Sequence, residues 1–77
     1  MLGSMTMRQG TRVRWKWGRS WAEGTIDEVH HDDVSRTTKG EEVTRHGSED
    51  NPAYVIRQDD GTVVLKLASE VERADGG

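Results

Sequence analysis

A strict alternation of apolar and cationic side chains near the start of the chain limits its fold most. Residues 11–17 place Val13, Trp15 and Trp17 between three cations, Arg12, Arg14 and Lys16. Side chains on an extended strand point alternately to its two faces, whereas no window of this chain has apolar residues at helical spacing. The segment therefore predicts a half-buried β-strand in an all-β domain.

A second strand is predicted over residues 22–30, and its apolar pattern is irregular. Ile26 and Val29 lie three positions apart, so a regular strand would point them to opposite faces. We predict a bulge or sharp bend between them, because bent strands turn the corners of small barrels.

Two hairpins are predicted in the rest of the chain. Asp60-Gly61 separates β-rich runs at residues 53–58 and 62–67, and glycine accepts the positive φ of a tight turn. A weaker, exposed hairpin or loop is predicted over residues 34–45, with a turn at Lys39-Gly40. The fold class expected from these elements is all-β, a small barrel of about five short, strongly bent antiparallel strands.

Composition limits the chain to one small domain with a thin core. Only 31% of the 77 residues are hydrophobic, and several of these lie in residues 1–7, which we interpret as an added, disordered leader. The barrel is predicted over residues 8–73, followed by a disordered tail over 74–77. With no cysteine, the chain can form no disulfide, and a reducing, cytoplasmic location is expected. It has no apolar run of membrane-spanning length, so no membrane partner is expected.

The charge distribution leaves nucleic acid as a possible partner. The net charge is −3, and an acidic chain is a poor general binder of phosphates. The first 25 residues are nevertheless basic. A hairpin there could bind nucleic acid locally. Its cations are Arg12, Arg14, Lys16 and Arg19.

Four aromatic side chains stand out in a chain without phenylalanine. Trp15 is expected in the core, between apolar neighbours on the first strand. Trp17 and Trp21 flank a Gly18-Arg19-Ser20 loop without other apolar residues, so they predict either a rim over the barrel end or a recognition surface. With Tyr54 they could bind a ligand as a cage for a cationic or methylated side chain. With the nearby arginines they could instead stack nucleobases.

Two polar segments contain residue types that metal and catalytic sites use. His30-His31-Asp32-Asp33 has four potential ligands in sequence, but neighbouring strand residues point to opposite faces, so a solvated loop is expected. His46 and Ser48 lie near several acids, yet no complete set of nucleophile, base and orienting group is present. We expect His46 to order its loop, and Ser48, Glu49 and Asp50 to bond turn backbone groups. The sequence predicts no metal, no cofactor and no enzymatic activity.

Several segments together resemble the hypervirulence-associated Tudor-domain family of short bacterial and fungal proteins. The resemblance covers about residues 9–73, and Ser48-Glu49-Asp50-Asn51-Pro52-Ala53-Tyr54 is its most specific part. The residues that match the family pattern are Trp15, His46, Ser48, Glu49, Asp50, Pro52 and Tyr54. The resemblance implies a Tudor-like, SH3-like barrel of about five strands and no established activity. Trp17 and Trp21 lie outside the family pattern.

The leading hypothesis is a non-enzymatic interaction module. It binds a protein segment or peptide through Trp17, Trp21 and Tyr54 at one end of the barrel. One alternative is nucleic-acid binding by the basic N-terminal hairpin. Another is self-association through a sheet edge, which would also relieve the thin core. A monomer or a weak homodimer is expected.

Overall fold

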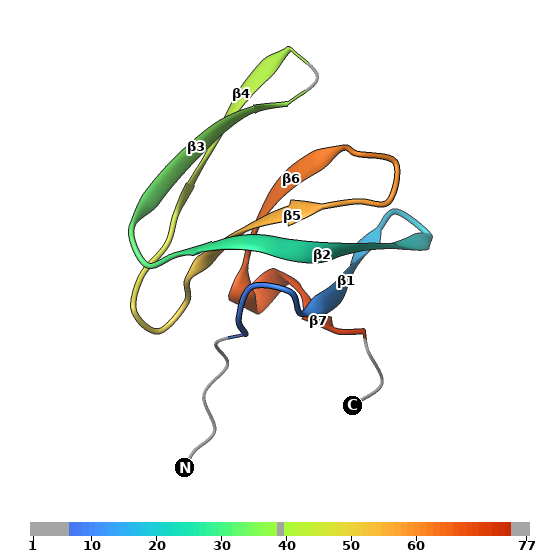
Figure 1. Cartoon of the computed structure of the whole chain (residues 1–77), viewed down its shortest axis with the longest axis horizontal. Helices are drawn as coiled ribbons and strands as arrows, with labels where there is room; N and C mark the ends of the chain where they lie inside the picture. The colour runs from blue at the N-terminus through green and yellow to red at the C-terminus, as the bar shows by residue number, and fades with distance from the viewer. Residues whose placement is uncertain (1–6, 39, 75–77) are drawn as a thin grey trace.

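The computed structural model describes residues 7–38 and 40–74, which form seven strands and one 3₁₀ turn, η1 (Figure 1). The strands are β1 (Arg12–Trp17), β2 (Ser20–His30), β3 (Asp33–Thr38), β4 (Glu41–His46), β5 (Ala53–Arg57), β6 (Val63–Leu67) and β7 (Glu72–Arg73), and η1 is Ala68–Glu70. Every strand pair is antiparallel. The predicted all-β class is therefore confirmed.

Five strands form one sheet in the order β6-β5-β2-β1-β7. The 11-residue strand β2 pairs with β1 through its first half and with β5 through its second half. A register shift between Ile26 and Glu28 marks a bulge in β2. Because of the bulge, Ile26 and Val29 both pack into one apolar cluster, as the sequence predicted.

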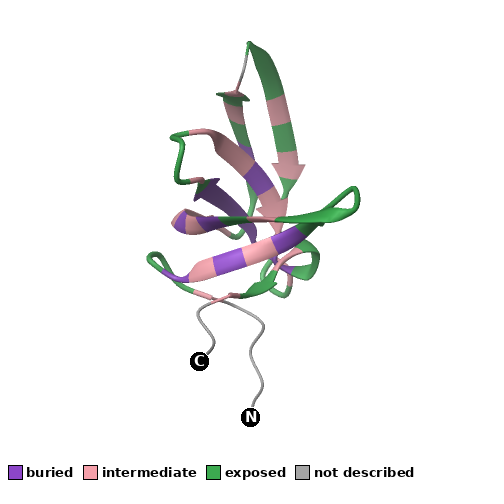
Figure 2. Ribbon diagram, turned by 90° about the vertical axis from the view of Figure 1, so that its right-hand side faces the viewer, coloured by how far each residue is buried: buried purple, intermediate pink, exposed green. Residues whose placement is uncertain are grey.

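Strand β5 lies between two apolar clusters, so its residues are buried on both faces. Alternate residues face opposite clusters: Tyr54 and Ile56 pack in the first, Ala53 and Val55 in the second. Arg57 is the one exposed residue of the strand. Figure 2 shows the buried segments gathered in the body of the sheet. The first cluster contains Val13, Trp15, Ile26, Tyr54, Ile56 and Ala68; the second contains Val34, Ala53, Val55 and Leu65.

Strands β3 and β4 form a separate two-stranded sheet, which we call the arm (residues 33–46). Among its described residues only Val34 is buried, and it packs in the second cluster. Ion pairs from Arg36 to Glu28 and from Arg45 to Glu70 also connect the arm to the body. The weak hairpin predicted over 34–45 is confirmed. In the described residues no strand ladder closes the main sheet into a barrel, and the arm instead covers one face of β5 and β6.

The predicted leader and tail lie almost entirely outside the described residues. At their inner ends, Met7 and Ala74 are hydrogen-bonded to the body. The Met7 amide donates to the hydroxyl of Tyr54 at 2.8 Å, and the Ala74 amide donates to the Arg12 carbonyl at 2.9 Å.

Candidate binding cleft

The turn between β1 and β2 decides how the two exposed tryptophans are placed. It has two residues, Gly18 and Arg19, with Gly18 at a φ of 62°, and the flanking pairs are Trp17 with Ser20 and Lys16 with Trp21. Adjacent pairs point to opposite faces of a hairpin. Trp17 and Trp21 therefore lie on opposite faces, and the prediction that they share one surface across a loop is corrected.

Tyr54 does not lie beside either of these tryptophans on the surface. It is 0% exposed, packs in the first cluster, and accepts a hydrogen bond from Met7. Its predicted place in an exposed aromatic cage is therefore wrong. Because β5 is buried on both faces, alternation along the strand could not reveal that Tyr54 points inward.

A cleft of about 380 Å³ opens between the turns of three hairpins. These are the β1–β2 hairpin, the arm and the β5–β6 hairpin, whose turns lie along one side of the molecule (Figure 1). The lining side chains come from all three, among them Trp15, Trp17, Thr38, Glu41, Gln58 and Asp60. Segments far apart in the sequence thus meet at this end of the fold.

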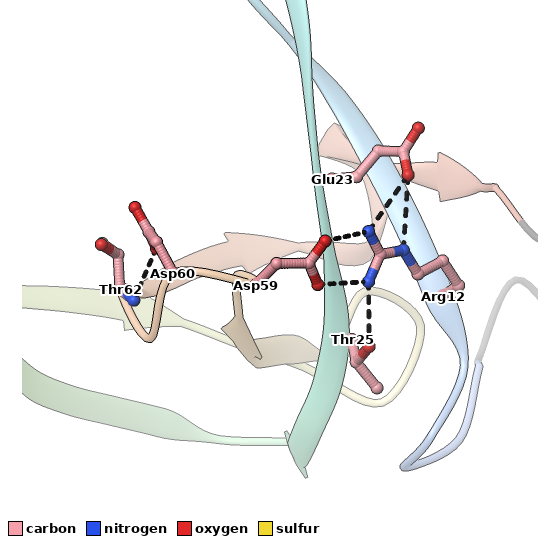
Figure 3. A network of polar contacts seen from close by, with 6 residues as sticks. All are labelled: Arg12, Glu23, Thr25, Asp59, Asp60 and Thr62. Carbon is pink, nitrogen blue, oxygen red and sulfur yellow. Dashed lines mark hydrogen bonds and ion pairs between the residues drawn. The ribbon is translucent and has the colours of Figure 1, made fainter.

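The cleft combines an aromatic wall with negative charge. Trp17 is 71% exposed, whereas Trp15, two residues before it on β1, is buried. Among the described residues, the charged side chains in the lining are Glu41 and Asp60. An Asp60 oxygen accepts the Thr62 amide at 2.9 Å, which fixes that carboxylate, as Figure 3 shows. A cation beside an aromatic face and near carboxylates is attracted by both, so the cleft is chemically suited to a cationic side chain.

On the opposite face of the hairpin, Trp21 contacts the chain's own cations. The Arg14 guanidinium lies 4.5 Å from the centre of its ring, and the Lys16 ammonium lies 5.5 Å away. These cation–π contacts hold a side chain that is still 47% exposed. Cation–π contacts therefore account locally for the position of Trp21, whereas the described residues make no such contact with Trp17.

Carboxylates compensate half of the cations proposed to bind nucleic acid. Arg12 forms ion pairs with Glu23 at 3.2 Å and with Asp59 at 2.9 Å (Figure 3), and Arg14 pairs with Glu72 at 3.2 Å. The hydrogen bond from Arg12 holds the pKa of Asp59 below its ordinary value. Paired cations release few counterions on phosphate binding, so this hairpin offers limited affinity for nucleic acid.

The remaining cations of that group, Lys16 and Arg19, lie near the end of the hairpin. Lys16 faces Trp21, and Arg19 is exposed in the turn. Neither makes an ion pair within the described part of the chain. Two isolated cations form a small patch, not the extended basic surface that a nucleic-acid backbone requires.

The turn between β4 and β5 acts as a structural connector. The Ser48 hydroxyl accepts the amide of Asn51 at 3.1 Å, which confirms its predicted role in the turn. Asn51 accepts the Ser69 amide at 2.9 Å, and the buried Pro52 accepts the Ala68 amide at 2.8 Å. Both bonds tie the turn to η1. Sequence reasoning missed Asn51, although asparagine in a turn commonly bonds backbone groups.

Two other motif residues, Glu49 and Asp50, are exposed in the same turn. Gly47 precedes them and lies close to the backbone of His30 and Ala53. A β-carbon there would lie 2.6 Å from the His30 carbonyl oxygen and 2.8 Å from the Ala53 nitrogen. A glycine is therefore needed where the arm returns to the body.

Two of the three histidines, His30 and His46, each pair with one carboxylate. His46 ends β4, and its Nδ1 lies 3.0 Å from the Asp33 carboxylate across the base of the arm, so its predicted role in ordering the loop is wrong. His30 and Asp33 belong to strands, which corrects the solvated loop predicted for residues 30–33. Among the described residues, no group of three or more histidine and acidic side chains is arranged to hold a metal ion.

Glu28 connects β2 to the arm. Its Oε1 lies 2.7 Å from His30 Nε2 and also pairs with Arg36 of β3. The hydrogen bond with His30, followed by the charge of Arg36, lowers the pKa of Glu28. The ionised carboxylate therefore helps to hold the arm, and with it the Glu41 side of the cleft.

Comparison with known families identifies the domain. The family model described as hypervirulence associated proteins TUDOR domain matches residues 10–71, from just before β1 to just after η1. The chain belongs to this family. Tudor domains are generally binding modules and are non-catalytic, which agrees with the general part of the leading hypothesis, that the domain is an interaction module.

No curated protein and no solved structure matches the chain significantly. Within the described residues, the Tudor domain has no helix long and apolar enough to cross a membrane.

Proposed function

We propose that this Tudor domain binds a positively charged segment of a protein partner in the cleft between its three hairpin turns. A lysine or arginine side chain lies over Trp17, with its charged end between Glu41 and Asp60. The observation that carries the proposal is the 71% exposure of Trp17 in a cleft where the charged side chains of the described lining are two carboxylates.

The exposure of Trp17 is the first argument for a ligand. A large aromatic side chain left in water forgoes the favourable burial that tryptophan gains in a core or an interface. Trp21 offsets part of this cost through Arg14 and Lys16, but no cation of the chain is found over Trp17 among the described residues. A partner's side chain would supply the missing contact.

The acidic lining argues for the sign of the partner's charge. Glu41 makes no ion pair with another described residue. It lies across the arm from Thr38, on the side that faces the cleft. A phosphate would be repelled by Glu41 and Asp60, so the same observation disfavours a nucleic-acid backbone. The methylene stem of a lysine or arginine would meanwhile pack on the indole.

An NMR titration tests the proposal. The ¹⁵N-labelled domain is titrated with capped glycine-serine peptides that differ only in a central lysine or glutamate. We expect the lysine peptide to shift resonances of the cleft and the glutamate peptide to leave them unchanged. Equal binding of both peptides, or binding of neither, would contradict the proposal.

A matched pair of variants tests whether the carboxylate of Glu41 in the cleft attracts the lysine peptide. Glu41→Gln removes a carboxylate from the cleft, whereas Glu42→Gln removes one from the opposite face of the arm, where Glu42 pairs with Thr37. We expect Glu41→Gln to weaken binding of the lysine peptide by about 1.5-fold to fivefold, the range of an exposed ion pair. Glu42→Gln should leave the affinity unchanged, so equal effects of the two variants would exclude the cleft.

A further inference from the structure

The polar side of the cleft consists mainly of hydrogen-bond acceptors. Glu41 and Asp60 contribute carboxylates, and Thr38 and Thr62 contribute hydroxyls that can also accept. An unmodified ammonium carries three N–H donors and a guanidinium five, so either can satisfy several of these acceptors at once. Hydrogen bonds between ionised partners are also stronger than neutral ones.

The aromatic side of the cleft is incomplete as an enclosure. Trp15 and Trp17 are the aromatic residues in the described lining, and Trp15 is only 3% exposed. Tyr54, the remaining candidate, lies in the first cluster. A cation reaching the cleft therefore meets one accessible indole. Its other sides face carboxylates, hydroxyls and the Gln58 amide, the apolar side chains of Ala22 and Val64, or water.

We infer that the cleft selects an unmethylated lysine or arginine and discriminates against the fully methylated side chain. Trimethylation keeps the positive charge of lysine but removes every N–H donor, so the acceptors lose their hydrogen bonds. One accessible indole, with Ala22 and Val64 beside it, does not form the aromatic enclosure that would give the added methyl groups cation–π contact on their other sides. This inference rests on the proposed function, because it specifies the ligand of the same cleft.

The test compares three capped peptides that differ only in the central side chain: lysine, trimethyl-lysine and norleucine. Dissociation constants are measured by NMR titration of the wild-type domain. We expect trimethyl-lysine to bind about fivefold to tenfold more weakly than lysine, since charged hydrogen bonds are lost. Norleucine, which lacks the charge as well, should bind most weakly.

A double variant shows whether the two carboxylates cause the discrimination. Glu41→Gln combined with Asp60→Asn removes both charges, while the asparagine Oδ1 can still accept the Thr62 amide that Asp60 accepts. The affinity ratio of lysine to trimethyl-lysine should fall toward one in this variant. An unchanged ratio would overturn the assignment of these carboxylates as the discriminating groups.

The outcomes separate this inference from the proposed function. If trimethyl-lysine binds as tightly as lysine or more tightly, while norleucine binds weakly, the inference is overturned and the proposed function stands. If lysine does not bind, or binds no better than norleucine, both are overturned. Lysine preferred over trimethyl-lysine, with norleucine weakest, supports both.

Discussion

Among the described residues of the arm, Val34 makes the most buried contact with the body, and Val34→Ala tests how much it stabilises the docked arm. Val34 is 5% exposed and packs in the second cluster beside Val55 and Leu65. The other described residues of the arm are exposed or only partly buried, as Figure 2 shows. Because Glu41 lies on the same arm, the variant should weaken both the fold and the cleft.

The expected magnitude follows from the groups removed. Replacing valine by alanine removes two methyl groups, and burial of each contributes about 0.8 kcal/mol. A further loss comes from the cavity that remains if the neighbouring side chains of the second cluster do not move to fill it. We expect a loss of about 1.5–3 kcal/mol in the free energy of unfolding. In a domain of this size that lowers Tm by about 6–24 °C.

The assay is urea unfolding followed by tryptophan fluorescence and circular dichroism. Thr37→Ala is the matched control, because Thr37 is exposed and lies opposite Glu42 on the other face of the arm. It should change stability by less than about 0.5 kcal/mol. If Val34→Ala were as stable as this control, the arm would not be anchored through the second cluster and the reasoning would fail.

Three further predictions concern the body of the domain. Gly24→Ala would place a β-carbon 2.6 Å from Ile56 Cγ2, so we expect a loss of about 1–3 kcal/mol in a urea melt, and wild-type stability would contradict the close approach. Tyr54→Phe removes the hydroxyl that accepts the Met7 amide at 2.8 Å, so we expect the free energy of unfolding to fall by about 0.5–1.5 kcal/mol. An unchanged free energy of unfolding would show that this hydrogen bond does not stabilise the fold. The lowered pKa of Glu28 means that its ionised form stabilises the fold above the pKa of the unfolded chain, and that this contribution is lost as pH falls through the folded pKa. Glu28→Gln should therefore lower Tm at neutral pH and converge with wild type in acid, and a constant difference across pH would exclude this linkage.

Local patterns were sufficient to predict much of the fold. The alternation over residues 11–17 predicted β1, and the spacing of Ile26 and Val29 predicted the bulge in β2. Both signals lie within a few residues along the chain, where side-chain direction follows from strand geometry. The packing of the arm on β5 and β6 was not predicted, because it depends on contacts between distant segments.

The candidate site was predicted less well, because the register of the β1–β2 hairpin differs from the one expected. A three-residue loop between Trp17 and Trp21 was expected, but the turn has two residues and β2 begins at Ser20. In a hairpin, a change of one residue moves a side chain to the opposite face. A two-residue turn that starts with glycine is a common hairpin connection, so this signal was present in the sequence.

Glu41 had no local signal that would connect it to the cleft. It lies in a polar, weakly patterned segment, and it reaches the cleft because the arm folds back over the body. Its place in the cleft depends on the tertiary packing of the arm, to which Val34 contributes, and not on a sequence motif around Glu41.

The most direct test of the account is to observe which tryptophan meets the lysine peptide. The domain has three tryptophans, so three indole N–H resonances are expected in a ¹H–¹⁵N spectrum, and Trp17→Phe and Trp21→Phe assign two of them. The account predicts that the lysine peptide shifts the Trp17 resonance with little change at Trp21, which lies on the opposite face. A shift confined to Trp21, with Trp17 unchanged, would contradict it.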